Sequence, residues 1–517
     1  MEYRPKAAVA VDSGDRLYRR ATTKLFKASL VVALAVFLSS PAVAQTQPPQ
    51  TPAGEDAAQS LKVALGLEAA LAGAIGQAEK SVVAIARERP RAAARNDDNS
   101  TPFFVERGPE DPEYVPHEFG AGVVIDRGGL IVTNHHVVGD PTKNRYWVWI
   151  NRRPYPAEVQ AADPWLDLAV LKIAATDLEP IRLADPKGVR KGQFVVALGN
   201  PYAIARDGSP SASWGIISNL SRKAPSSTPR SVSGGSETLH HFGTLIQVDC
   251  RLPRGTSGGA LVNLQGELVG LTTSLAALEG TDAQAGFAIP TNEPFRKAID
   301  LLKRGKQPEY GFLGIGPELL ALEQRQKGEG GVRVRQIVAG TPAARSELRV
   351  GDLITHVAGE RVWDGSDLIR ELSGREAGAT IDLGVQRRER PNGPAATVRV
   401  PVELAKKYVG GGGLFPYAIE AAPTWRGMRV EYSTAIPRFE DHVRDLDEDG
   451  CVAVLDVQPN SSAWKSGLRP GMFVSHIDAQ RVTRPTDFHT ATQNKPGEVR
   501  LRLVGAKSQD AEKVVPP

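Results

Sequence analysis

The stretch RGTSGGALVN (residues 254–263) places Ser257 among glycines, directly before an apolar run. A serine hydroxyl is a weak nucleophile near neutral pH, so it needs a base that takes its proton and N–H groups that hold the oxyanion formed on attack. Gly255 can adopt backbone angles that a side chain would forbid, which lets its N–H and that of Ser257 point at one spot. A flexible glycine loop is the alternative interpretation of this string taken alone.

A base and a carboxylate lie upstream of Ser257. IVTNHHVVGD (residues 131–140) contains two histidines, and DPWLDLAVLKI (residues 163–173) contains two aspartates. A neutral imidazole accepts a serine proton, and a carboxylate behind it fixes the tautomer and stabilises the imidazolium. The chain order His, Asp, Ser is that of serine proteases built on two β-barrels. The sequence therefore predicts a mainly β fold with a chymotrypsin-like double barrel.

At these residues the chain resembles the HtrA (Deg) family of serine proteases. TNHHVV is similar to the family's Thr-Asn-any-His-Val-Val motif, which assigns His136 as the base and leaves His135 as a polar neighbour. DLAVLKI is similar to the family's aspartate motif, which assigns Asp167, whereas Asp163 precedes a proline and is interpreted as a turn residue. Other similar segments follow the family's order from residue 81 to about 302: GAGVVID (120–126), VVALGNPY (195–202), WGIISNL (214–220), LIQVDC (245–250) and AGFAIP (285–290).

The resemblance implies a role for each of these residues. Ser257 would attack the scissile carbonyl, His136 would shuttle the proton, and Asp167 would orient His136. The backbone N–H groups of Gly255 and Ser257 would hold the oxyanion. The family usually carries Asn before its serine, whereas this chain has Thr256, which is also small and polar. Neither a cofactor nor a metal is expected.

The specificity pocket of this fold is expected between residues 248–255, 271–274 and 283–287. These segments are mostly apolar or small, which predicts cleavage after small or medium aliphatic residues. Asp249 is interpreted as a structural aspartate of the family's Gln-x-Asp motif. Ala285 stands where the family often has a branched residue, which predicts a roomier pocket.

The second half of the chain repeats itself. GTPAARSELRVGDLITHVAGERV, which starts at residue 340, aligns without gaps with NSSAWKSGLRPGMFVSHIDAQRV, which starts at residue 460. Short alternating strands, Gly turns and one helical segment predict two copies of a small α+β module. Both copies resemble PDZ domains, which bind an extended peptide by strand addition and hold its C-terminal carboxylate with backbone N–H groups.

The two PDZ-like modules differ at the loop that would hold the carboxylate. In the first module this loop is YGFLGIG (residues 310–316), with four peptide-binding residues expected: Phe312, Leu313, Gly314 and Ile315. In the second it is WRGMRV (residues 425–430), where Trp425 and Arg426 replace the usual aliphatic lip. We therefore expect C-terminal peptides to bind the first module and the second to serve mainly assembly. The alternative for either is a module that packs against the protease and binds nothing.

An acidic segment of the second PDZ-like module raises the question of a calcium site. DLDEDG (residues 445–450), followed by Asp456, fits the spacing of a calcium loop. The flanking helices that such a loop requires are not evident, and CVAVLDVQP (residues 451–459) has the pattern of a strand. A solvated acidic turn is therefore favoured over a calcium site.

The N-terminal segment has the pattern of a signal peptide. Basic residues precede an apolar run at residues 28–38 and the small-residue sequence Ala42-Val43-Ala44. The run is shorter than a membrane span, so a cleaved signal is favoured over an anchor. An exported, periplasmic protein is expected, with membrane association through an uncleaved segment as the alternative. No other segment is expected to cross a membrane.

Six segments are expected along the chain: a signal peptide (1–44), a disordered linker with an amphipathic helix at 57–79 (45–80), the protease domain (81–304), a first PDZ-like domain (305–407), a flexible Gly-rich linker (408–423) and a second PDZ-like domain (424–517). The 63 basic and 59 acidic residues are interspersed, so the net charge of +4 does not indicate nucleic-acid binding. Cys250 and Cys451 fall in different domains, so they are expected to be buried and unpaired.

These features predict an exported serine endopeptidase of HtrA type. The resemblance implies that its substrates are unfolded or damaged envelope proteins. The resemblance implies regulation by peptides bound to the PDZ-like domains and assembly into homotrimers or multiples of trimers. Two alternatives stay open at this point. One is a peptide-binding chaperone or scaffold that does not cleave its clients, and the other is a protease specific for one envelope partner.

Overall fold

The computed structural model describes most of the chain beyond residue 53. The residues described are 54–89, 109–111, 114, 116, 118–203, 209–224, 238–273, 286–390, 393–411, 416–420, 422–437, 446–505 and 511–517. The expected signal peptide (1–44) lies outside these residues. The described residues from Leu67 to Pro517 form one compact unit.

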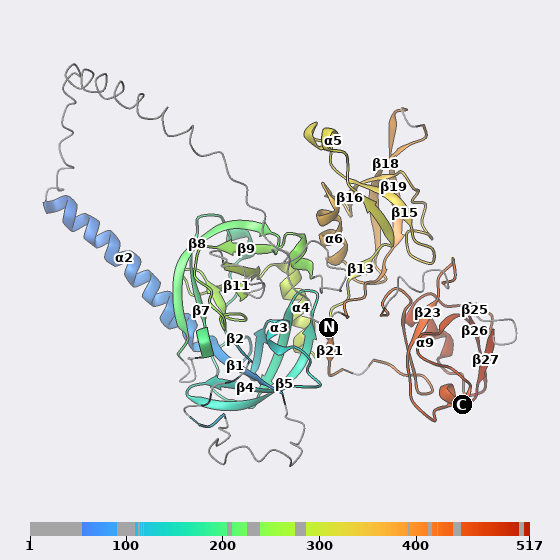
Figure 1. Cartoon of the computed structure of the whole chain (residues 1–517), viewed down its shortest axis with the longest axis horizontal. Helices are drawn as coiled ribbons and strands as arrows, with labels where there is room; N and C mark the ends of the chain where they lie inside the picture. Colours follow the sequence, from blue (N-terminus) through green and yellow to red (C-terminus); the bar gives the residue numbers. More distant parts are fainter. Residues whose placement is uncertain are drawn as a thin grey trace, which may run out of the picture. The chain divides into compact units, whose positions relative to one another are not determined.

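A long helix precedes the first strand. Helix α2 (Gly54–Ala78), blue in Figure 1, leads into the short 3-10 helix η1 (Glu79–Ser81). Leu71 and Ile75 pack against the protease core, whereas Leu61 and Val63 are 60% and 66% exposed. Residues Ala57–Ser81 reach a mean hydropathy of 1.3 and are long and apolar enough to cross a membrane by length and composition. The expectation that no segment beyond the signal peptide could do so was therefore wrong.

Six strands close the first barrel, in the order β5-β4-β1-β2-β3-β6 with β6 returning to β5. They are β1 (Val82–Glu88), β2 (Glu118–Val124), β3 (Leu130–Thr133), β4 (Arg145–Ile150), β5 (Arg153–Asp163) and β6 (Leu168–Ile173). The short helix α3 (His135–Val138) follows β3. The strands are rich in β-branched residues, which pack well on a pleated surface. Val83, Ile131 and Leu171 fill the barrel interior together with other buried apolar residues.

Six more strands form the second closed barrel, in the order β10-β11-β12-β9-β8-β7. They are β7 (Phe194–Gly199), β8 (Ser211–Arg222), β9 (Leu245–Val248), β10 (Ala260–Val262), β11 (Leu268–Thr273) and β12 (Gly286–Pro290). Short 3-10 helices lie between strands at η2 (Pro186–Gly188), η3 (Pro201–Ala203) and η5 (Leu239–Phe242). Helix α4 (Glu293–Lys303), capped by Asn292, buries Phe295 and Leu302. The predicted double barrel is confirmed (Figure 1).

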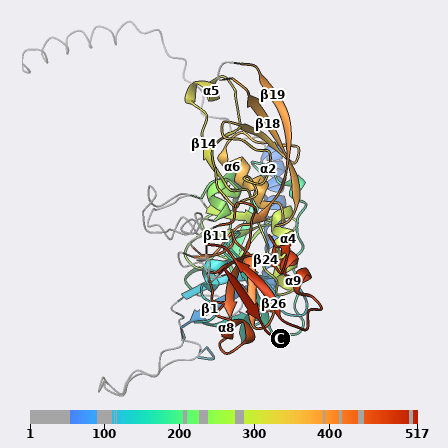
Figure 2. The same cartoon turned by 90° about the vertical axis from the view of Figure 1, so that its right-hand side faces the viewer.

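The two C-terminal modules have the same strand order. The first contains β13 (Gly311–Phe312), β14 (Ile315–Glu318), α5 (Leu322–Gln326), β15 (Val332–Ile337), β16 (Leu353–Val357), β17 (Glu360–Arg361), α6 (Gly365–Ser373), β18 (Thr380–Arg388), β19 (Ala395–Glu403) and β20 (Ala405–Lys406). The second contains β22 (Met428–Tyr432), β23 (Val452–Val457), α8 (Ser462–Lys465), β24 (Phe473–Ile477), β25 (Gln480–Arg481), α9 (Pro485–Thr492), β26 (Val499–Leu503) and β27 (Glu512–Val515). Figure 2 labels β14, β18 and β19 of the first module and β24 and β26 of the second. β16, β17 and α6 begin 120 positions before β24, β25 and α9, which matches the sequence repeat.

The acidic segment of the second module is part of this β-rich fold. Asp456 lies in β23, as the strand pattern predicted, and Asp447 forms an ion pair with Arg481 at 2.9 Å. Asp445 lies outside the described residues. Cys250 and Cys451 are both buried and unpaired.

The segment between the two modules differs from the expected flexible linker. Strand β21 (Tyr417–Ala418) pairs antiparallel with Ala161 and Ala162 of β5 in the first barrel. β4 pairs with β5 only as far as Ala157, so β21 occupies the edge that β4 leaves open. An open strand edge carries unpaired N–H and C=O groups, which explains why a passing segment pairs there. Gly412 and Gly413 lie outside the described residues.

A buried ion pair distinguishes the cores of the two modules. Arg387 donates to both oxygens of Asp352, at 2.8 and 2.7 Å, and both side chains are at least nine-tenths buried. In the second module Met472 stands where the repeat places Asp352 in the first, so an apolar side chain replaces the acid. The first module therefore depends on a charge pair that the second lacks.

We expect Arg387→Met to destabilise the first PDZ-like module by about 3 kcal/mol, because it leaves the Asp352 carboxylate buried and unpaired. Hydrogen exchange of β18 peptides, followed by mass spectrometry, measures this stability locally. The double variant Asp352→Met/Arg387→Met should recover most of the loss. Equal exchange in the parent and the single variant would contradict the prediction.

Candidate active site

The first barrel brings His136 and Asp167 together. His136 lies on α3 after β3, and Asp167 lies in the turn between β5 and β6. β6 pairs with both β5 and β3. The His136 ring nitrogen Nδ1 is 2.8 Å from Oδ2 of Asp167 and 3.0 Å from Oδ1. Burial alone would raise the pKa of Asp167, but the charge of His136 and its hydrogen bond outweigh burial and hold that pKa below its usual value. The carboxylate is therefore kept charged against the imidazole.

Asp167 adopts a left-handed backbone conformation with φ of +53°. Such a conformation is unfavourable for a residue with a side chain and persists only where the surroundings enforce it. Its carbonyl oxygen accepts hydrogen bonds from His135 N at 3.1 Å and from Asn134 Nδ2 at 3.2 Å, and Oδ1 accepts from His136 N at 3.0 Å. The residues around the base thus hold the backbone as well as the side chain of the aspartate.

The second barrel supplies Ser257, which is 4% exposed, from the turn between β9 and β10. Its carbonyl oxygen accepts from Ala121 N on β2 at 2.8 Å, so the turn rests on the first barrel. A Cβ on Gly120 would press against Val137, the neighbour of His136, and approach the Ser257 carbonyl. His136 Nε2 is buried and has no hydrogen-bond partner among the described residues. With Nδ1 bound to Asp167, Nε2 is the ring atom available to take a proton.

Close contacts around the turn that carries Ser257 require glycine at two positions. Gly255 has φ of +99°, and a Cβ there would overlap the Asn200 carbonyl oxygen and the Phe119 ring. Gly258 has φ of +82°, and its Cβ would overlap the Ala121 carbonyl oxygen. Both left-handed conformations and both close approaches exclude a side chain.

The backbone amides of the same turn fall into two groups. Thr256 N donates to Pro253 O at 3.1 Å and Gly258 N to Thr272 O at 2.8 Å, so both amides are used within the fold. Within the described part of the chain no acceptor is found for the Gly255 N–H. The Thr256 hydroxyl also donates to Pro253 O, at 2.8 Å, so Thr256 stabilises the turn.

Two buried side chains that contact the turn at residues 163–167 were not predicted from the sequence. His240 is fully buried, with Nε2 2.9 Å from Leu166 O and Nδ1 2.8 Å from Thr244 Oγ1, and burial lowers its pKa. The Tyr310 hydroxyl donates to Asp163, the residue expected to act only in a turn. Both come from segments more than 70 positions away from the turn. No local pattern in the sequence could have found them.

The expected pocket walls lie on neighbouring strands of the second barrel. Gly286 of β12 pairs with Val248 of β9, and a Cβ on Gly286 would press on Leu252. Asp249 Oδ1 accepts from Ile216 N at 2.6 Å, which agrees with a structural role for this carboxylate. Residues 274–285, including Ala285, lie outside the described residues.

In the first PDZ-like module the expected peptide-binding loop precedes an edge strand. β14 stands at the end of the sheet order, so one of its edges is unpaired in the sheet. Leu313 is buried in the module core and Gly314 has φ of +87°, where a side chain would overlap Thr341. Phe312 and Ile315 are partly buried on either side. The loop is positioned for strand addition along β14.

In the second module the corresponding loop is closed. Trp425 N donates to Met428 O at 2.8 Å and Met428 N to Trp425 O at 2.9 Å. Arg426 and Gly427 between them both have positive φ, which makes a tight turn. The Trp425 ring packs edge-on against Phe488 of α9, with centroids 5.5 Å apart. The N–H groups of Trp425 and Met428 are therefore already used within the loop, and the Trp425 ring packs on the module's own helix.

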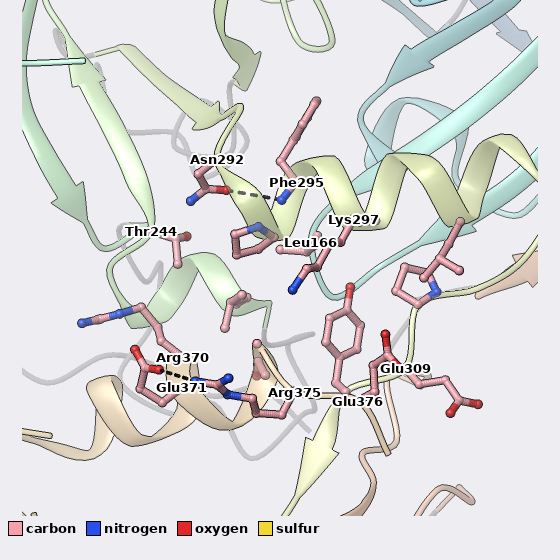
Figure 3. Close-up of a pocket in the computed structure, with 18 of the residues that line it drawn as sticks. Leu166, Thr244, Asn292, Phe295, Lys297, Glu309, Arg370, Glu371, Arg375 and Glu376 are labelled. Carbon is pink, nitrogen blue, oxygen red and sulfur yellow. Dashed lines mark hydrogen bonds and ion pairs between the residues drawn. The ribbon is translucent and has the colours of Figure 1, made fainter. Parts of the chain in front are cut away.

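A cavity lies between the protease domain and the first PDZ-like module. Its volume is about 590 Å³. Figure 3 shows Phe295 and Lys297 on α4 at one side and Arg370 and Glu371 on α6 at the other. Leu166, which immediately precedes Asp167, also lines it. The cavity thus borders the turn that carries the aspartate.

The matches to known families cover both kinds of domain. Residues 120–271 match the trypsin-like peptidase domain, and residues 311–402 match the PDZ domain. The periplasmic serine endoprotease DegP of Salmonella typhimurium is 29% identical over 391 residues, which cover 74% of this chain and 74% of that protein. The periplasmic pH-dependent serine endoprotease DegQ of Escherichia coli is 28% identical over 409 residues, or 78% of this chain and 81% of that protein.

Among solved structures, the HtrA-type protease AlgW with decapeptide is 26% identical, covers 65% of this chain and 98% of that chain, and has a TM-score of 0.49. The peptidase match contains His136, Asp167 and Ser257, and the PDZ match begins with the loop before β14. The chain thus has a trypsin-like peptidase domain followed by a PDZ domain, and it is similar to the serine endoproteases DegP and DegQ.

Proposed function

We propose that the chain is an exported protease that cleaves unfolded or damaged proteins of the envelope, with His136, Asp167 and Ser257 as its catalytic triad. The observation that carries the triad is the bond between His136 Nδ1 and Asp167, which leaves Nε2 as the proton acceptor. The relatives named periplasmic proteases support the location.

The chemistry follows from the positions of these groups. Ser257 Oγ attacks the scissile carbonyl carbon while its proton passes to His136 Nε2. The carbonyl oxygen becomes an oxyanion, which the N–H groups of Gly255 and Ser257 stabilise. The amine leaves with the proton from Nε2, and a water molecule then repeats the sequence to release the acid and regenerate the serine. Asp167 stays ionised and stabilises the imidazolium at each step.

The substrate class follows from the same fold. A backbone must be extended to reach a serine in a turn between two barrels, which favours unfolded segments over folded domains. The apolar and small residues near the serine favour cleavage after small or medium aliphatic residues. Assembly into homotrimers, or multiples of trimers, is proposed from the family resemblance.

Regulation is assigned to the first PDZ-like module. Its edge strand β14 and the loop before it suit the C-terminal end of an extended peptide, which would add a strand and place its carboxylate on the loop amides. The closed loop of the second module supports a role in assembly. Peptides released from damaged proteins carry such free C-termini, so they are the effectors that the site fits.

We expect Ser257→Ala to abolish casein cleavage, with a fall in kcat of about 10⁶-fold, and Asp167→Asn to lower kcat by about 10⁴-fold. The purified full chain is assayed with and without an apolar C-terminal peptide, which should stimulate the parent. Thermal unfolding of each variant controls for loss of structure. Casein binding by the parent and by Ser257→Ala without cleavage by either would favour the chaperone interpretation instead.

We expect an octapeptide that ends in valine to bind the full chain at one site per chain, because Trp425 N and Met428 N of the second module's loop already donate to each other's carbonyl oxygens. Isothermal titration calorimetry measures the stoichiometry. The same peptide with an amidated C-terminus should bind at least about tenfold more weakly, since charge-assisted hydrogen bonds to the carboxylate are lost. A stoichiometry of two would show that the second module also binds.

A further inference from the structure

The turn that carries Asp167 is anchored by a second, buried carboxylate. Asp163, at the end of β5, is 2% exposed and accepts from Trp165 N at 3.1 Å and from Leu166 N at 3.3 Å. These two hydrogen bonds bend the chain back toward β6, and Asp167 follows directly. The position of the catalytic aspartate therefore depends on Asp163 remaining a strong acceptor.

The third partner of Asp163 comes from the start of the first PDZ-like module. Tyr310, which is 5% exposed, donates its hydroxyl to Asp163 Oδ2. Burial raises the pKa of Asp163 to about 7, and the hydrogen bond from Tyr310 acts in the opposite direction. The hydroxyl thus favours the charged form of a carboxylate that burial would otherwise neutralise.

Tyr310 is the first residue of the peptide-binding loop of this module (residues 310–316). Its carbonyl oxygen accepts from Lys407 N at 2.7 Å, and Gly311 N donates to Arg375 O at 2.8 Å. β13, which begins at Gly311, pairs with β20. A peptide that orders the loop at residues 311–314 would therefore also restrain the tyrosine.

A second contact joins the same module to the same turn. Trp165 Nε1 donates at 3.2 Å to the hydroxyl of Ser373, the last residue of α6. The Trp165 ring lies 6.3 Å from the Tyr310 ring and 6.0 Å from the Phe242 ring, centroid to centroid. Arg370 of α6 also donates to the Phe242 carbonyl. Tyr310 of the loop thus contacts Asp163, and Ser373 of helix α6 contacts Trp165. Both elements of this module therefore contact the turn at residues 163–167.

We propose that Tyr310 is a positioning residue for catalysis: its hydroxyl holds Asp163, Asp163 holds the turn, and the turn holds Asp167 against His136. Through this contact, occupancy of the peptide-binding loop alters the competence of the triad. The inference rests on the proposed function, since it names the connection between the peptide site and the catalytic site. Because such coupling is reciprocal, the state of Ser257 must also alter the affinity for peptide.

The test compares Tyr310→Phe with Tyr114→Phe in the full chain. The control is matched, because Tyr114 is also a buried protease-domain tyrosine whose hydroxyl donates to a carboxylate, that of Glu88. We expect Tyr310→Phe to lower peptide-stimulated kcat on casein at least about tenfold with little change in KM, since misplaced catalytic groups slow the chemical step. Tyr114→Phe should retain the kcat and the stimulation of the parent.

Reciprocal binding separates positioning from general destabilisation. A fluorescent C-terminal octapeptide should bind the parent more tightly once Ser257 has reacted with a fluorophosphonate. Tyr310→Phe should bind the peptide with equal affinity before and after that reaction. In an Asp163→Asn background, where the carboxylate is absent, Tyr310→Phe should cause no further loss of kcat.

The possible outcomes distinguish this inference from the proposed function. No cleavage by the parent would overturn the proposed function and, with it, this inference. Cleavage and stimulation by the parent, with the same stimulation in Tyr310→Phe, would overturn the inference alone. If Tyr310→Phe does not fold, Ser373→Ala, which removes the acceptor of Trp165, should still reduce the peptide stimulation, and an unchanged stimulation would reject the coupling.

Discussion

The hydrogen bond between His136 Nδ1 and Asp167 depends on an unfavourable backbone conformation at Asp167. Asp167 lies in the left-handed region, where a side chain is unfavourable, and its carbonyl and carboxylate are held by Asn134, His135 and His136. Closure of the first barrel places β3 beside β6 and so brings these segments together. Barrel closure, the strained turn and the orientation of the base are therefore parts of one constraint.

The constraint continues outward from the catalytic residues. Behind Asp167 lies Asp163, whose partners come from its own turn and from Tyr310 in the next domain. His240 supports the carbonyl of Leu166 from a third segment. A buried charge with several donors is rigid when each donor is present and costly when one is lost. The turn that carries Asp167 is thus held in part by contacts with the first PDZ-like module.

The two repeated modules show how similar sequences acquire different uses. Their strands and helices coincide at an interval of 120 positions, yet the first has an edge strand behind an extended loop, and the second has its loop bonded to itself. Trp425 causes much of this difference, because its ring covers Phe488 and its backbone pairs with Met428. Between the modules, β21 pairs with β5 and connects the intervening segment to the protease. The same chain thereby provides a binding site, a closed module and a strand that covers an open edge.

The double barrel, the repeat and the candidates His136, Asp167 and Ser257 could all be predicted from the amino-acid sequence, because each depends on a local motif or on a periodic pattern. The need for glycine at positions 255 and 258 was also readable from the motif, and positive φ with close carbonyl contacts gives the physical reason. Three features emerged from the folded structure: Tyr310 contacts Asp163, residues 417–418 form a strand, and Trp425 pairs with Met428 within its own loop. The first two features join segments far apart in the chain, and their hydrogen bonds and packing exist only once the barrels and modules have formed.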